Sequence, residues 1–172
     1  MEWIRTELFE AVTGTFSPPV AVTVSAMLPV FELRLAVPLG ILQFRLPVWE
    51  VYTLAVVGNL VPVLPLLFFL SFFFHGVQQV PVFGRLFRWW FERVERKSQR
   101  VRRWGFWGLV LMVAIPLPMT GAWTGCAAAA LLEVPLRRAV AAITLGVLCA
   151  GAAVTLLSVG AGGIVTRWFL PN

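Results

Sequence analysis

The apolar residues of this chain are gathered into long stretches that carry no charge. Residues 51–74, 105–132 and 139–166 contain no Asp, Glu, Lys or Arg. Each stretch exceeds the roughly 20 residues that a helix needs to cross a hydrocarbon core about 30 Å thick. The pattern therefore predicts an all-α integral membrane protein.

The segment 17–45 is apolar, but residues that break a helix or carry charge interrupt it. They are Pro29, Glu32, Arg34, Pro38 and Gly40. A straight helix would bring a glutamate, an arginine and two prolines close to the middle of the membrane. Irregular backbone at that depth is tolerated where protein or a water-filled cavity surrounds it. We therefore predict a re-entrant hairpin, whose two short helices enter and leave the membrane on one side.

The segment 105–133 has the same irregularity. The sequence Ile-Pro-Leu-Pro-Met-Thr-Gly occupies its centre, at residues 115–121. The expected breaks are Pro116, Pro118, Gly121 and Gly125. Two glycines four residues apart also favour close packing between helices. We predict a second re-entrant hairpin here.

A true membrane span follows each hairpin, at residues 46–75 and 134–165. The first contains Pro62 and Pro65, so we expect a kinked helix. The second carries Arg137 and Arg138 at its start.

Two further segments are amphipathic. Residues 1–14 set an apolar stripe against several charged residues, which predicts a helix lying in the membrane interface. Residues 81–104 are rich in arginine, with apolar residues at helical spacing, and hold most of the excess behind the net charge of +6. Nucleic-acid binding is the rival interpretation of such a charge. Because membrane segments flank it on both sides, a basic helix on the cytoplasmic surface explains the segment more simply.

The order of amphipathic helix, broken hairpin and span occurs twice within a single membrane domain, in residues 1–80 and 81–172. Matching positions lie about 88 residues apart: Gly58 and Gly146, Leu60 and Leu148, and the tripeptides at 46–48 and 134–136. With the basic linker inside the cell, the two halves have opposite orientations. Inverted repeats with broken helices recur among transporters. The predicted fold is thus an inverted repeat of these three elements.

Charge also predicts the topology. The linker at 81–104, with Lys97, should be cytoplasmic, and both termini should face outward. The N-terminal residues include acids and lack a basic region before an apolar core, so we expect no signal peptide. The membrane segments would then direct the chain to the inner membrane themselves.

Two ionisable residues at the first break are the leading candidates for chemistry. Ionisable groups inside a membrane are costly and usually face a cavity. Glu32 can exchange a proton, and Arg34 can hold a carboxylate or phosphate with paired donors. The alternative is that the two residues only pin the tip of the hairpin.

The second tip has no charge but offers polar groups. They are the hydroxyls of Thr120 and Thr124 and the indole N–H of Trp123. A half-helix N-terminus there would also present N–H groups to an anion. Asn59, in the first span, is either a bonding partner for a neighbouring helix or part of the substrate path. His75 more often serves as an interfacial anchor than as a ligand.

The chain offers little for enzyme catalysis or for metal binding. Cys126 and Cys149 lie in apolar runs without a Cys-x-x-Cys pair, so we expect two small buried thiols rather than a disulfide or a zinc site. The apolar core contains no Ser/His/Asp or Cys/His set and no paired carboxylates. We therefore expect neither an enzyme nor a bound cofactor, although proton or ion coupling is compatible with the sequence.

Two motifs carry a family resemblance. They are Glu32-Leu-Arg34-Leu-Ala36-Val-Pro38-Leu-Gly40 and Pro116-x-Pro118-x-Thr120-Gly121-Ala122-Trp123-x-Gly125. With them the chain resembles the small multidrug export proteins, a family that looks related to the DedA/VTT superfamily. The resemblance spans roughly residues 17–160.

This resemblance implies paired re-entrant hairpins and transport. For DedA-like members it also implies movement of lipids such as the undecaprenyl phosphate carrier, often with proton coupling. DedA-like proteins carry arginines in the second hairpin region. Here the second tip is uncharged, and Arg137 and Arg138 come only at the exit of the hairpin.

Three functional hypotheses follow. The first is a transporter or lipid translocase for an amphiphilic, anionic molecule, and the second is a multidrug exporter of cationic amphiphiles. The third is a membrane assembly factor that does not transport. The expected partners are membrane lipids, the substrate and a second copy of the chain, because small-residue runs at 127–130 and 160–163 could pack in a homodimer.

Overall fold

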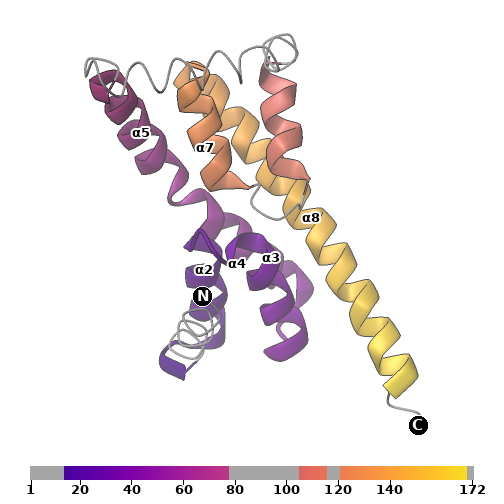
Figure 1. Cartoon of the computed structure of the whole chain (residues 1–172). Coiled ribbons are helices and arrows are strands. Elements are labelled where there is room, and N and C mark those ends of the chain that lie inside the picture. The colour runs from indigo at the N-terminus through magenta and orange to yellow at the C-terminus, as the bar shows by residue number, and fades with distance from the viewer. Residues whose placement is uncertain (1–13, 78–104, 116–120, 170–172) are drawn as a thin grey trace. The chain divides into compact units, whose positions relative to one another are not determined.

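The structure of the protein is a computed structural model, which describes residues 14–77, 105–115 and 121–169 (Figure 1). All secondary structure in these ranges is helical, which confirms the all-α part of the predicted class. The elements are α2 (Pro18–Met27), α3 (Glu32–Pro38), the π-helix η1 (Leu39–Gln43), α4 (Val48–Leu60), α5 (Val63–Val77), the helix Gly105–Ala114, α7 (Ala122–Leu131) and α8 (Leu136–Phe169). The amphipathic helices expected at 1–14 and 81–104 lie outside the described residues, apart from Gly14.

Within the described residues, two stretches are long and apolar enough to cross a membrane, Val48–Leu70 and Leu136–Gly160. They correspond to the two spans expected from the sequence. The first is interrupted at Val61 and Pro62, between α4 and α5, because proline cannot donate the next helical hydrogen bond. This interruption is where the sequence predicted a kink.

The first broken segment contains two short helices, as expected. α2 begins with Pro18 and Pro19 in its first turn, where a missing N–H costs nothing. It ends at Met27, ahead of Pro29, and α3 begins three residues after that proline. α2 packs against α3, and both pack against α4.

Pro38 and Gly40 differ from the expectation that they break the helix. Pro38 ends α3, but the chain continues directly into η1, where the N–H of Phe44 donates to the carbonyl oxygen of Leu39 at 3.0 Å. A π-helical turn uses hydrogen bonds five residues apart, which lets the coil continue past the proline.

The chain forms two compact units that do not follow the two sequence halves. The first unit combines residues 1–62 with 147–172, and the second comprises residues 63–146. Each unit therefore contains one broken helix pair, the first half of the span that follows it, and the second half of the other span.

Within the first unit, α4 and the second half of α8 are in direct contact. The Tyr52 hydroxyl donates to the carbonyl oxygen of Leu148 at 3.3 Å, and a Cβ placed on Gly151 would lie 3.1 Å from the Tyr52 ring. Within the second unit, α5 packs against α7, and the Cys126 thiol lies 3.8 Å from the carbonyl oxygen of Val63. Each half-span thus has a packing partner in its own unit.

Local features recur between the units at the spacing of about 88 residues seen in the sequence. Arg45 and Glu133 both have positive φ, 53° and 51°. Each precedes a proline whose carbonyl oxygen accepts two N–H groups of the next helix: Pro47 from Glu50 and Val51, and Pro135 from Arg138 and Ala139. The same turn therefore starts both spans.

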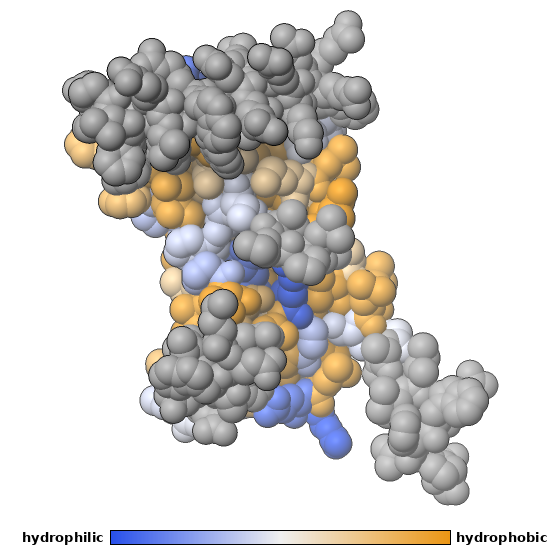
Figure 2. All heavy atoms as spheres, in the orientation of Figure 1, coloured by the Kyte–Doolittle hydropathy of each residue, from blue (hydrophilic) through white to orange (hydrophobic). Residues whose placement is uncertain are grey.

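The described surface is rich in apolar side chains (Figure 2). Large exposed examples on the spans are Phe68, Phe69, Phe72, Leu156 and Leu157, and Phe72 is 84% exposed. Exposed apolar faces of this extent suit contact with lipid rather than water. Cys126 is buried as expected, whereas Cys149 is exposed, because it lies on a face of α8 that this chain leaves uncovered.

Candidate functional site

The break between α2 and α3 is built around Leu28. Its carbonyl oxygen accepts the N–H groups of Phe31 at 3.2 Å and Glu32 at 2.9 Å, and its own N–H donates to Ser25 at 3.2 Å. Pro29 has no N–H to donate to the Ser25 carbonyl oxygen, as the next residue of a continuous helix would. The N–H of Leu28 supplies that hydrogen bond instead. The result is a compact turn that places Glu32 at the first position of α3.

Glu32 is held in an unusual backbone conformation. Its φ is +47°, in the left-handed region that costs a non-glycine residue about 1–2 kcal/mol. Such strain persists only where the surrounding structure fixes it, and it is found often at functional sites. The sequence did not indicate this, because Gly, Asn and Asp are the usual residues there.

Glu32 forms an ion pair with Arg34. The residue is 8% exposed, and its Oε2 lies 3.8 Å from Nη2 of Arg34. The arginine side chain is 27% exposed, so it is the more accessible member of the pair. A carboxylate that is removed from water needs a nearby positive charge, because a buried charge without a partner is strongly destabilising. The distance exceeds the roughly 2.7–2.9 Å of a strong charged hydrogen bond.

Asn59 is a second buried polar group in the first unit. It is 2% exposed, and its Oδ1 has no hydrogen-bond partner within the part of the chain that the structure describes. Its neighbour Gly58 packs so closely on α2 that a Cβ there would overlap the backbone oxygen of Thr23. Asn59 is therefore the residue next to the point where α4 packs against α2. An unsatisfied buried oxygen costs about 1–3 kcal/mol, so its presence calls for a role.

Thr155, in α8, is a polar residue that the sequence analysis missed. Its Oγ1 is the other buried side-chain oxygen without a partner among the described residues. Thr155 lies within an uncharged run of small and apolar residues, where nothing in the sequence distinguishes it from a helix-packing threonine.

The second break has a different chemistry. The Thr124 hydroxyl accepts the N–H of Gly121 at 2.9 Å and lies 3.1 Å from the Gly121 carbonyl oxygen. It therefore fixes the start of α7, where we had expected it to face a substrate. Trp123 is half-buried in the first turn of the same helix. Thr120, Pro116 and Pro118 lie outside the described residues.

Two glycines near the breaks serve close packing. A Cβ on Gly125 would lie 2.6 Å from Cγ2 of Val113, and one on Gly40 would lie 2.7 Å from both methyl groups of Val51. The packing interpretation of Gly125 therefore holds. Gly40 likewise allows close packing in the first unit, against α4. We had expected it to break the helix instead.

The structure thus brings some of the candidate residues together. Glu32 and Arg34 form a pair in the first unit, which also contains Asn59, whereas Trp123 and Thr124 belong to the second unit. His75 lies in α5, and its side chain is outside the described ones.

Comparison with known proteins gave one family. The model of the family described as "Putative small multi-drug export protein" matches residues 32–153. The match begins at Glu32, continues through α4, α5 and the second broken pair, and ends in α8. Neither a curated protein nor a solved structure gave a significant match.

Proposed function

The chain belongs to the small multi-drug export family, and on that premise we propose that it is a transporter for an amphiphilic, anionic molecule. The observation that carries this proposal is the buried Glu32 beside the more accessible Arg34 at a helix break. A guanidinium group binds carboxylates and phosphates with paired hydrogen bonds. Broken helices supply polar backbone groups at the same place.

The ion pair suggests how a proton is coupled to the anion. With Glu32 ionised, the carboxylate neutralises Arg34 and repels an incoming anion. Protonation of Glu32 would remove that negative charge, so that the Arg34 guanidinium could bind the anion without competition from the carboxylate. Loss of the proton would restore the pair and help to release the substrate.

We further propose that the two broken helix pairs are re-entrant hairpins related as an inverted repeat. α2 has 10 residues and α7 has 10. At 1.5 Å per residue each helix is about 15 Å long, roughly half of the hydrocarbon thickness. The matching turns before Pro47 and Pro135 support the repeat. A lipid translocase of the DedA type, acting on a lipid phosphate, is the form of this proposal that the resemblance to DedA-like proteins implies, although the second tip lacks their arginines.

Export of cationic amphiphiles is the second candidate function, and the family description favours it. In that case Glu32 would bind the cation directly. Transport in proteoliposomes, measured with an anionic and a cationic fluorescent amphiphile of similar size, separates the two. We expect uptake of the anionic probe that increases with a proton gradient. Preferential uptake of the cation would replace our proposal with the second candidate, and no uptake of either probe would favour a non-transporting assembly factor.

The orientation gives a separate prediction. Arg137 and Arg138 are exposed at the start of α8, and the basic segment 81–104 precedes the helix Gly105–Ala114. Because positive loops stay in the cytoplasm, we expect a cysteine at position 97 to react only after the membrane is permeabilised. Cysteines at the two ends of the chain should react from outside. A Cys149→Ser background removes the native exposed thiol. Labelling of position 97 in intact cells would contradict the topology.

A further inference from the structure

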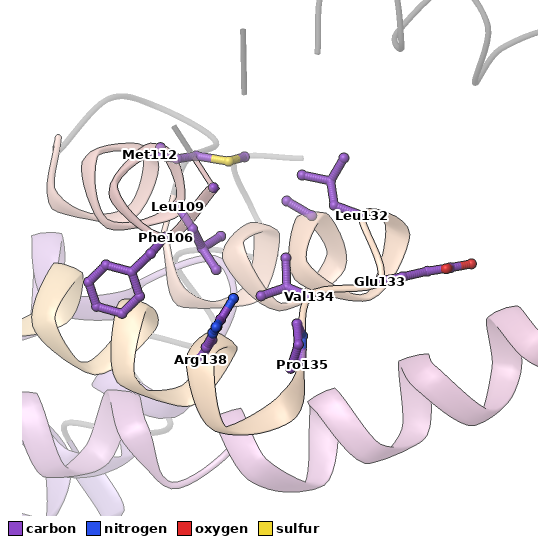
Figure 3. A pocket seen from close by; sticks show the side chains of 11 residues that line it. Phe106, Leu109, Met112, Leu132, Glu133, Val134, Pro135 and Arg138 are labelled. Carbon is purple, nitrogen blue, oxygen red and sulfur yellow. The ribbon is translucent and has the colours of Figure 1, made fainter. Parts of the chain in front are cut away.

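A groove of about 570 Å³ lies within the second unit, at the end of α7 that is farther from the break (Figure 3). Its walls come from the helix Gly105–Ala114, the end of α7 and the start of α8. Most of the lining is apolar, with Phe106, Leu109, Met112, Ala128 and Leu132 among its residues. The volume falls within the range of about 300–1,000 Å³ that is typical of ligand pockets.

The two charged residues in the described lining of this groove, Glu133 and Arg138, have side chains that point in different directions. Figure 3 shows the Arg138 side chain pointing toward Leu109 and the Glu133 side chain pointing away from the groove. The positive φ of Glu133 turns the chain just before Pro135 and so contributes to this separation. Of the two charged residues in the described lining, Arg138 is the one whose side chain points toward the apolar walls.

We propose that this groove binds an anionic phospholipid of the surrounding membrane, with an acyl chain along the apolar walls and the phosphate on Arg138. The observations that carry the inference are the apolar lining and the inward Arg138 beside an outward Glu133. The described groove lining includes none of the candidate residues for transport, so the inference stands whether or not the chain transports a substrate.

Two features of the chain favour a lipid over a soluble anion. Residue 105, the first of the described lining, follows directly on the basic segment 81–104, whose Arg102 and Arg103 suit an anionic membrane surface. A soluble phosphate would leave the apolar walls exposed to water, whereas an acyl chain covers them.

The first repeat lacks the charge needed for such a site. At the repeat spacing of about 88 residues, Glu50 corresponds to Arg138 and Arg45 corresponds to Glu133, so both charges are reversed. The proposed site is therefore particular to the second repeat, and it would select lipids from only one leaflet.

The test measures lipid retained by the purified full-length protein. The protein is extracted from membranes of mixed phosphatidylglycerol and phosphatidylcholine, and the bound lipid is counted by native mass spectrometry. We compare Arg138→Gln with Arg137→Gln, an equal loss of charge one residue away at an exposed position outside the groove lining. A third variant, Ala128→Phe, fills the groove without changing the charge.

We expect the wild type to retain phosphatidylglycerol over phosphatidylcholine, and Arg138→Gln to weaken that retention about tenfold, as loss of a charged hydrogen bond implies. Ala128→Phe should reduce retention of both lipids, and Arg137→Gln should behave as the wild type. Equal losses in the two arginine variants would show diffuse surface charge and overturn the site, as would unchanged retention in Arg138→Gln. Competition by soluble glycerol phosphate, equal to that by the lipid, would show that the headgroup alone binds and would also overturn it.

Discussion

Replacing Gly58 with alanine is expected to destabilise the protein by about 3 kcal/mol, the upper end of the cost of overpacking a core. The added methyl group would overlap the backbone oxygen of Thr23 and approach the Cβ of Ala26 to 3.1 Å. A flexible side chain can move away from such a contact, but a carbonyl oxygen in α2 cannot move without displacing the helix. The displacement would be passed to the turn at Leu28 and so to Glu32.

The measurement is thermal unfolding of the purified protein in detergent, with Gly14→Ala as the matched control. Gly14 is also helical, and a Cβ placed there meets nothing within 4 Å. Alanine favours a helix over glycine by up to about 1 kcal/mol, so the control should be neutral or slightly stabilising. A Gly58→Ala protein as stable as its control would show that α4 does not press on α2.

The same experiment can be done in the other unit by replacing Gly146 with alanine. A Cβ there would lie 2.6 Å from the Cβ of Val113 and 3.0 Å from the carbonyl oxygen of Val110. The two glycines, about 88 residues apart, thus allow the same approach of a span to the first helix of a broken pair. The match between Gly58 and Gly146 thus has the same physical explanation in both halves, which is close helix packing.

The breaks were predictable where a proline ends a helix and the following residues form a turn. Pro29 is the example, since α2 ends two residues before it. The outcome at Pro38 was not predictable, because the residues after it continue the coil as a π-helix. No local signal in the sequence distinguishes such a continuation from a break. The two compact units were not visible in the sequence, because each span contributes its first half to one unit and its second half to the other.

The candidate site was predictable in its residue types but not in its conformation. A charged pair within an apolar segment is visible in the sequence, and the structure forms the pair between Glu32 and Arg34. The positive φ of Glu32 was not visible, because tertiary packing rather than local preference sets it. The use of the Thr124 hydroxyl to fix the start of α7 depended on the position of Gly121, which spacing alone did not reveal.

The largest functional effects are expected at Glu32 and Arg34. Glu32→Gln keeps the size of the side chain and faces the same left-handed φ, but it cannot ionise. We expect transport that no longer depends on pH, because no carboxylate then neutralises Arg34 at any pH or returns to displace the anion. Binding of the anion should persist, and release should become slow.

Arg34→Ala tests the other half of the pair. It removes the group that would hold the anion, so binding should weaken by about 1.5–3 kcal/mol, which is the contribution of a hydrogen bond to a charged group. It also leaves the buried Glu32 carboxylate without this compensating charge. Arg34→Lys keeps the charge without the paired donors and should recover only part of the binding.

Stability distinguishes this mechanism from a pair that only pins the break between α2 and α3. A pinning pair predicts that Glu32→Gln and Arg34→Ala each lose stability. It also predicts that the two combined lose no more than either alone, because the same contact is removed. The transport mechanism predicts small changes in thermal stability and different functional defects in the two single variants. The decisive measurement is uptake of an anionic amphiphile between pH 5 and pH 8 by well-folded Glu32→Gln protein, where wild-type pH dependence would exclude Glu32 as the proton-coupling group.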